Sequence, residues 1–250
     1  MLKVRVIPCL TIKELRLVKS VQFADHRNIG SYIAAVRVFN TRDVDEMIVL
    51  DLDGHETGPK PWLLEEITKE CFMPLTIGGG IKTLDHISSV LKIGADKISI
   101  NSAALKDPFF INQAAATFGR QCIVVSIDAC RSPAGGYEIF SRTAASPTAR
   151  SVVVWAREVE ARGAGEIMLT SVERDGMMNG YDTDLVRAVT EAVSIPVIAS
   201  GGAGSVGDFV KVVETSNAAA VAAASVFQYT QVTPMNIKQH LIKSGIPARI

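Results

Sequence analysis

Two short glycine turns are the first features of this sequence whose residue types and spacing could do chemistry. They are Gly78-Gly79-Gly80 and Ser200-Gly201-Gly202, and each lies four to six residues after a proline. Backbone N–H groups in such turns can bind a phosphate, because glycine lets the chain bend tightly around an anion. Each turn is followed by an apolar segment that ends in small residues, Asn101-Ser102 and Ala224-Ser225. Two such sites predict a ligand with a phosphate at each end; glycines that serve only the turns are the alternative.

Two aspartates could transfer protons near these turns. Asp128 ends the apolar run 122–128, and Asp175 follows the run 166–170. A carboxylate at the carboxyl end of a barrel strand is typical of a catalytic acid or base. Helix capping by Asp128 and loop capping by Asp175 are the alternatives. The position that corresponds to Asp128 in the first half of the chain is Thr11, which offers a hydroxyl instead of a carboxylate.

Four charged residues lie at or near the starts of apolar runs, at the end opposite to the turns and aspartates. They are Arg5, Glu46, Lys97 and Glu166. Charges beside a buried strand are costly unless they are paired, so two cations and two anions are expected to neutralise one another as a ring. From the residues alone, the simplest role of this floor ring is to close the bottom of a barrel, since bottom-face residues usually serve stability.

Eight short apolar runs supply the elements that must position these residues. They are continuously apolar, which is typical of parallel strands covered on both faces. Amphipathic stretches such as 152–162 and 182–192 lie between them and predict helices. Eight alternations in about 250 residues favour a (β/α)8 TIM barrel over a doubly wound sheet, which would carry a GxGxxG motif after its first strand. The runs are 4–10, 47–52, 74–78, 97–101, 122–128, 166–170, 196–200 and 218–225.

An internal repeat relates the two halves of the chain. The two glycine turns and their prolines are offset by 122 residues, and Glu46 and Glu166 are offset by 120. Self-similarity at one fixed offset indicates duplication of a structural unit. We therefore predict one barrel domain, residues 1–250, built from half-barrels of about 1–120 and 121–250.

Composition excludes several classes of protein. The chain has 250 residues, 48% of them hydrophobic, and its 26 Lys and Arg balance its 26 Asp and Glu. No basic excess points to nucleic acid or to an anionic membrane. The four cysteines form no CxxC pair, so neither a zinc site nor a disulfide scaffold is expected, and we predict no metal and no cofactor. The absence of a long apolar run and of a signal-peptide pattern predicts a cytoplasmic protein.

A collinear set of motifs resembles the cyclase subunit of imidazole glycerol phosphate synthase over essentially the whole chain. The resemblance implies a glutaminase partner that docks on the barrel floor and ammonia that passes up the barrel to a bisphosphate substrate. It also implies that Arg5, Glu46, Lys97 and Glu166 are an ammonia gate rather than a plug. The matching runs are IPCL, VDE…VLD, GGGI, GADKISINSAAL, QCIVVSIDA, GAGEIMLTS, RDG…GYD, SIPVIASGGAG and ASVF.

The candidate site therefore has two parts. Asp128 and Thr11 occupy the two positions of the proton-transferring acids in the family. The remaining candidates are expected to bind the substrate or its phosphates: Lys19, Gly79, Gly80, Asn101, Ser102, Thr170, Asp175, Gly176, Gly201, Gly202, Ala224 and Ser225.

The departures from the family pattern all fall in segments at the top of the predicted barrel. A threonine cannot ionise near neutral pH, so Thr11 cannot replace the family's strand-one aspartate in proton transfer. Glycines of the following loop are replaced by Leu15 and Ser20, and a threonine after the second strand is Asp53. Two further loops carry Ala149 and Met177 where the family has glycine and threonine.

This pattern resembles a divergent group of paralogues associated with surface-polysaccharide genes. These pass ammonia from a glutaminase to a sugar amidotransferase, and the runs FNTRDVDE and ECFMP are similar to that group. A working cyclase–lyase of histidine biosynthesis is the first alternative. A phosphoribosyl isomerase of the same fold is the second, although it would need paired carboxylates on strands one and five. A non-catalytic phosphate-binding scaffold is a further possibility.

Overall fold

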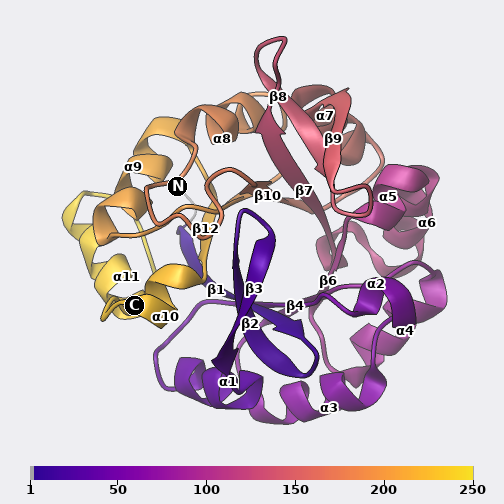
Figure 1. Cartoon of the computed structure of the whole chain (residues 1–250), viewed down its shortest axis with the longest axis horizontal. Coiled ribbons are helices and arrows are strands. Elements are labelled where there is room, and N and C mark those ends of the chain that lie inside the picture. Colours follow the sequence, from indigo (N-terminus) through magenta and orange to yellow (C-terminus); the bar gives the residue numbers. More distant parts are fainter. Residues whose placement is uncertain (1–2, 250) are drawn as a thin grey trace.

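The computed structural model describes residues 3–249 as a closed barrel of eight parallel strands inside a ring of helices (Figure 1). Each barrel strand pairs in parallel with its neighbours, and β10 closes the barrel by pairing with β7 as well as β11. The predicted (β/α)8 class and the eight predicted strands are confirmed. The barrel strands are β1 (Arg5–Lys13), β4 (Met47–Asp51), β5 (Leu75–Gly78), β6 (Lys97–Ile100), β7 (Ile123–Arg131), β10 (Glu166–Ser171), β11 (Val197–Ser200) and β12 (Ala220–Ala223).

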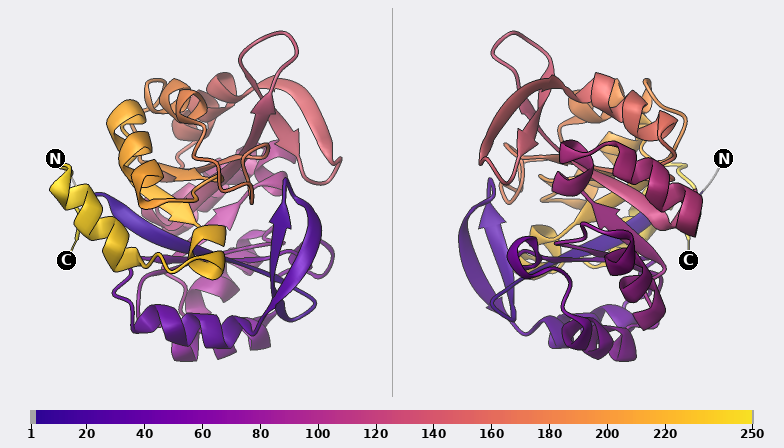
Figure 2. Two further views of the ribbon diagram at one scale, coloured as in Figure 1. Left: turned by 60° about the vertical axis from the view of Figure 1, so that its left-hand side comes forward. Right: turned by 90° about the vertical axis from the view of Figure 1, so that its right-hand side faces the viewer.

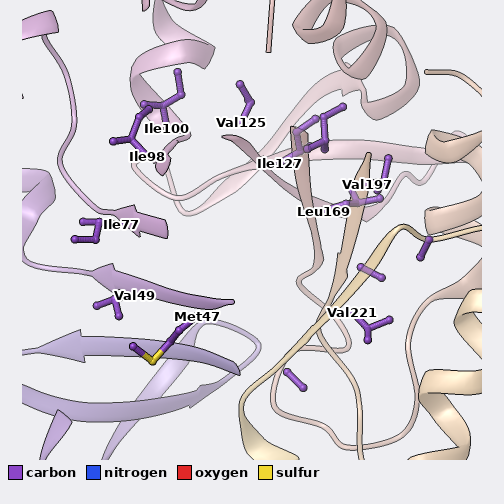
Figure 3. Packing of buried hydrophobic residues seen from close by; sticks show 14 of the residues in the cluster. Met47, Val49, Ile77, Ile98, Ile100, Val125, Ile127, Leu169, Val197 and Val221 are labelled. Carbon is purple, nitrogen blue, oxygen red and sulfur yellow. The ribbon is translucent and has the colours of Figure 1, made fainter. Parts of the chain in front are cut away.

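Alternate side chains of each strand point to opposite sides of the barrel wall, as the two-residue period of a strand requires. Ile48 and Met168 belong to a small cluster inside the barrel. Their neighbours Val49 and Leu169 belong to the large cluster that packs against the helices (Figure 3). The same parity places the side chains of Thr11 and Asp128 on the inner side of the wall. This explains why the runs are continuously apolar: both faces are buried.

Helices cover the outside of the barrel, and several begin with the caps expected from the sequence. Asp182 caps α8 by accepting a hydrogen bond from the N–H of Leu185, and Ser151 caps α7. The two predicted helices over 152–162 and 182–192 are confirmed within two residues at each end. The helices are α1 (Tyr32–Asn40), α2 (Gly54–Thr57), α3 (Pro61–Glu70), α4 (Leu84–Ile93), α5 (Ser102–Lys106), α6 (Phe109–Phe118), α7 (Val152–Ala161), α8 (Thr183–Thr190), α9 (Val206–Ser216), α10 (Ser225–Tyr229) and α11 (Pro234–Lys243), with a 3-10 turn at Arg120–Cys122.

Two β-hairpins that the sequence did not predict stand at the carboxyl ends of the barrel strands. β2 (Arg16–Val21) and β3 (Ala24–Gly30) follow β1, and β8 (Tyr137–Ser141) and β9 (Ser146–Ser151) follow β7. Figure 2 shows both hairpins at one end of the barrel and both chain termini at the other. We call the hairpin end the top and the opposite end the floor. In residues 3–249 no helix is long and apolar enough to cross a membrane.

Candidate active site

A cavity of about 1440 Å³ opens at the top of the barrel. Its wall contains every predicted substrate- or phosphate-binding residue, together with Thr11. Residues of the β2–β3 and β8–β9 hairpins, such as Phe23 and Arg142, complete the wall. The barrel therefore gathers side chains from distant parts of the sequence around one large cavity, as the strand order predicted.

Asp128 is the exception, because it does not line this cavity. It lies within β7, where its side chain is fully buried, and no helix begins there, so the alternative of a helix cap is wrong. Its Oδ2 accepts hydrogen bonds from Arg142 Nε at 2.6 Å and from Asn101 Nδ2 at 2.8 Å. Arg142 belongs to the β8–β9 connection and lies between Asp128 and the cavity. The predicted proton-transfer group is thus present, but a guanidinium covers it.

Thr11 lies on β1, where it is paired with Leu50 on one side and Val18 on the other. Its half-buried side chain forms part of the cavity wall. Cys9, two residues earlier on the same face, is buried, and burial raises the pKa of its thiol to about 11. Cys9 is therefore neutral at pH 7 and cannot supply the negative charge that the family has at position 11.

Lys19 and Asp175 form a second pair at the top of the barrel. Lys19 Nζ lies 2.8 Å from Asp175 Oδ1, and both side chains are largely buried. The N–H of Gln22 donates to the backbone oxygen of Asp175, which fixes the β2–β3 hairpin to the loop after β10. Asp175 thus binds a lysine at the cavity instead of capping its own loop.

Both glycine turns have conformations that only glycine adopts readily. Gly80 and Gly202, which the offset of 122 relates, have φ of +71° and +108°, in the region that side chains disfavour. A Cβ would lie 1.9 Å from the oxygen of Gly54 at Gly80 and 2.2 Å from that of Gly180 at Gly202. The two turns are therefore close approaches of backbone to backbone in equivalent places. This agrees with the predicted half-barrels, which remain a prediction.

An unpartnered hydroxyl marks the second turn. Ser225 begins α10 beside Ser200-Gly201-Gly202, and its buried Oγ has no hydrogen-bond partner in the described structure. A buried polar atom without a partner costs about 1–3 kcal/mol, and a ligand that accepts a hydrogen bond from this hydroxyl would remove that cost. A phosphate oxygen held by the turn would be such a ligand.

We expect Ser225→Ala to stabilise the empty protein by about 1 kcal/mol while weakening phosphate binding. The reason is that alanine removes an unsatisfied hydroxyl from the empty site and a hydrogen-bond donor from the occupied one. Urea unfolding with and without phosphate measures both effects. Ser216→Ala is the control, because Ser216 is equally buried but donates to the oxygen of Val212, so this variant should be destabilised. Destabilisation of Ser225→Ala without phosphate would contradict the assignment.

The four floor residues form a closed ring of ion pairs. Arg5 Nη1 lies 2.7 Å from Glu46, and Arg5 also pairs with Glu166. Lys97 Nζ lies 3.0 Å from both glutamates. Thr76 adds a hydrogen bond to Glu46 at 2.7 Å. Each cation therefore contacts both anions, as the sequence predicted, and the ring spans the barrel below its apolar interior cluster.

Sequence reasoning missed Arg142, a cation of the cavity wall, and Lys60, which binds two aspartates of that wall. Lys60 Nζ lies 3.0 Å from Asp51 and 3.4 Å from Asp53. Asp53 in turn accepts a hydrogen bond from the N–H of Glu14 at 2.7 Å, so it holds the turn between β1 and β2. Neither cation lies in a motif, and each meets its carboxylate only through the fold. For Arg142, the only signal in the sequence was that a basic residue follows the strand that contains Asp128.

No group of three or more His, Cys, Asp or Glu side chains in residues 3–249 is arranged to hold a metal ion. Carboxylates in or behind the cavity wall are instead bound by cations of the chain: Asp175 by Lys19 and Asp51 by Lys60 in the wall, and Asp128 by Arg142 behind it. This donor arrangement suits an organic anion, which can compete for the cations.

Comparison with known proteins agrees with this geometry. Residues 5–233 match the family model described as histidine biosynthesis protein. The imidazole glycerol phosphate synthase subunit HisF of Hyphomonas neptunium (strain ATCC 15444) is 45% identical over 252 residues, which cover 100% of this chain and 99% of that protein. The fold, the cavity and these similarities lead to one conclusion: the chain belongs to the histidine-biosynthesis family of (β/α)8 barrels and is HisF-like.

Proposed function

We propose that the chain receives ammonia from a glutaminase subunit at its floor and binds a bisphosphate ligand at its top. The observation that carries this proposal is the arrangement of three features along one barrel axis. The ring of Arg5, Glu46, Lys97 and Glu166 closes the floor, an apolar interior follows, and the large cavity with two glycine turns lies above. The name of the 45% identical relative describes one subunit of a synthase, which supports a partner.

The interior between ring and cavity suits a neutral molecule. It is lined by apolar side chains such as Ile48, Met168 and Ala222. Burying an ion there would cost much free energy. Ammonia avoids most of this cost because it is uncharged. The ring therefore acts as a gate in this proposal: its side chains must move to admit ammonia and then close again.

The state of the proton-transfer groups supports a changed reaction at the top. Ring closure in the cyclase family uses two carboxylates, whereas this chain has Thr11 at one position and a covered Asp128 at the other. We infer that its cyclase step is slow and that ammonia is passed on to a sugar amidotransferase in surface-polysaccharide biosynthesis. Cytoplasmic location follows from this role.

A working cyclase of histidine biosynthesis is the second candidate function. It is favoured by the full-length 45% identity to a HisF subunit. Phosphoribosyl isomerase activity is less well supported, because it would need paired carboxylates on β1 and β7 and only Asp128 is present. The neighbouring genes discriminate: histidine-pathway neighbours favour the cyclase, and a sugar amidotransferase favours ammonia transfer.

The glutaminase interface has a candidate anchor in Phe72. This residue lies in the loop between α3 and β5 at the floor, and it is 86% exposed. Its N–H donates to Asn40 Oδ1 at 3.1 Å, so the loop is tied to the end of α1. A large exposed aromatic side chain on a fixed loop is typical of an interface hot spot.

We expect the glutaminase encoded beside this chain to bind it and to hydrolyse glutamine faster in the complex. Phe72→Ala should raise the Kd about 30-fold, because hot-spot truncation costs about 2 kcal/mol. Phe109→Ala is the control, since Phe109 is also exposed but begins α6 near the top. Titration calorimetry and glutamate release measure the two effects. Failure of any neighbouring glutaminase to bind the native chain would overturn the proposed partner.

A further inference from the structure

Arg142 covers Asp128, the one carboxylate present at the two predicted proton-transfer positions. The Asp128 side chain is 0% exposed, while that of Arg142 is 32% exposed and lines the cavity. Arg142 Nε donates to Asp128 Oδ2, and its Nη2 lies 3.5 Å from Oδ1. Since Asn101 also donates to Oδ2, the oxygens that would accept a proton already have donors.

The covering position of Arg142 is held from the other side as well. Its guanidinium carbon lies 3.8 Å from the centre of the Phe23 ring, a cation–π contact with the β2–β3 hairpin. Burial acts to lower the pKa of Arg142, but the charge of Asp128 and its hydrogen bond raise the pKa above its usual value. The guanidinium thus stays charged, and only movement, not deprotonation, can uncover Asp128.

An anion in the cavity would give Arg142 another partner. Asn101, which also donates to Asp128, adjoins Ser102, and Ser102 was predicted with the turn of residues 78–80 to form the first phosphate site. The geometry of the arginine guanidinium suits phosphate and carboxylate alike, because two parallel N–H groups can donate to either one. Lys19, another cation of the cavity wall, is already held by Asp175.

We propose that Arg142 is a positioning residue that exchanges Asp128 for an anionic group of the bisphosphate ligand and so uncovers Asp128 only when the ligand is bound. This inference rests on the proposed bisphosphate site. In the empty protein the pair satisfies two buried charges and keeps the base out of use. In the occupied protein Arg142 holds the ligand, and Asp128 faces it.

A double-mutant cycle on ligand affinity tests this exchange. The probe is the phosphoribulosyl formimino carboxamide bisphosphate, titrated without ammonia or glutamine so that no turnover occurs. Arg142→Gln should raise the Kd about tenfold in the native background, because a hydrogen bond to a charged group contributes about 1.5–3 kcal/mol. In the Asp128→Asn background the same change should raise the Kd of the probe by a factor at least about five times larger. The reason is that Arg142 is already free to bind the ligand in that background.

The coupling measures whether Asp128 and the ligand compete for Arg142, since Asp128→Asn frees the guanidinium. Whether Arg142 leaves Asp128 in the native protein is decided by the signal of Arg142 itself. The variant with both changes also leaves no unpaired buried charge, so it guards against misfolding of the Arg142→Gln single variant.

A spectroscopic measurement follows Arg142 directly. In protein labelled with 15N-arginine, the Nε–H signal that disappears in Arg142→Gln should shift when the probe is added. Arg150→Gln is the matched control: Arg150 has the same 32% exposure, lies over the Trp155 ring and pairs with Glu158, but does not line the cavity. This control should bind the probe normally.

The outcomes separate the two proposals. Probe binding without coupling, or without a shift of the Arg142 signal in the native chain, would overturn the exchange and leave the proposed function intact. No binding of the probe by the native chain or any variant would overturn the bisphosphate site, and the exchange with it.

Discussion

Supplied with free ammonia and the bisphosphate substrate, the purified protein should close the ring at least ~10²-fold more slowly than a relative with carboxylates at both positions. A positioned general acid or base contributes about 10²–10⁴-fold, and Thr11 cannot replace one because a threonine hydroxyl does not ionise near neutral pH. The neutral Cys9 thiol on the same face of β1 does not replace it. Free ammonia is used so that the partner and the floor ring do not limit the rate.

Thr11→Asp should restore part of this rate and only part. Leu15 and Ala149 also differ from the family pattern and have left-handed backbone, with φ of +58° at each. Asp128→Asn should abolish whatever activity exists, because neither of the two predicted proton-transfer positions then carries a carboxylate. Steady-state assays of ring closure by the native protein, Thr11→Asp and Asp128→Asn measure these effects. If the native chain turns over at the rate of an ordinary cyclase, Thr11 is no lesion and the histidine-biosynthesis function replaces ammonia transfer to a sugar.

The barrel could be predicted from the sequence because each strand is buried on both faces. Segments such as 122–128 and 166–170 are continuously apolar, and the barrel strands begin and end within a few residues of these limits. The floor ring was predictable for the same reason. A charged residue such as Lys97 at the start of a buried strand has to find a partner inside the barrel.

The two hairpins could not be predicted, because their strands are short and largely polar and their turns lack the usual glycines. Gln22 and Phe23 have φ of +50° and +64°, and Ala145 has +49°, so ordinary residues take left-handed conformations there. Turn prediction relies on Gly, Asn and Asp at such positions. The missing hairpins hid Arg142 and Phe23, and with them the cover over Asp128.

Asp128 shows what cannot be predicted from the position of a residue at the end of a strand. Its place at the top of β7 follows from the apolar run, but its accessibility depends on a side chain fourteen residues later. No spacing rule connects the two residues, since the hairpin that brings them together has no fixed length. Charge pairing across a hairpin is a tertiary property, and here it decides whether the carboxylate can react.

Loss of one floor carboxylate should strongly destabilise the protein at neutral pH. Glu46→Gln leaves Arg5 and Lys97 with only Glu166 as a partner, and breaking a buried ion pair from one side costs about 3 kcal/mol. Burial acts to raise the pKa of Glu46, but Lys97, Arg5 and the Thr76 hydroxyl outweigh it and hold this pKa below the usual 4.5. The ionised carboxylate therefore stabilises the folded ring.

The pH dependence of this effect has a definite sign. Because the pKa of Glu46 is lower in the folded chain, its contribution is full above pH 4.5 and is lost as the pH falls through the folded value. Urea unfolding of the native protein and Glu46→Gln should differ most near pH 7 and converge as the pH falls below the folded pKa of Glu46. Glu70→Gln is the control, since Glu70 also binds an arginine, Arg37, but in an exposed pair that should hardly affect stability. Equal stability of native and Glu46→Gln proteins at pH 7 would mean that the ring pairs are not formed in solution, and the gate would lose its physical basis.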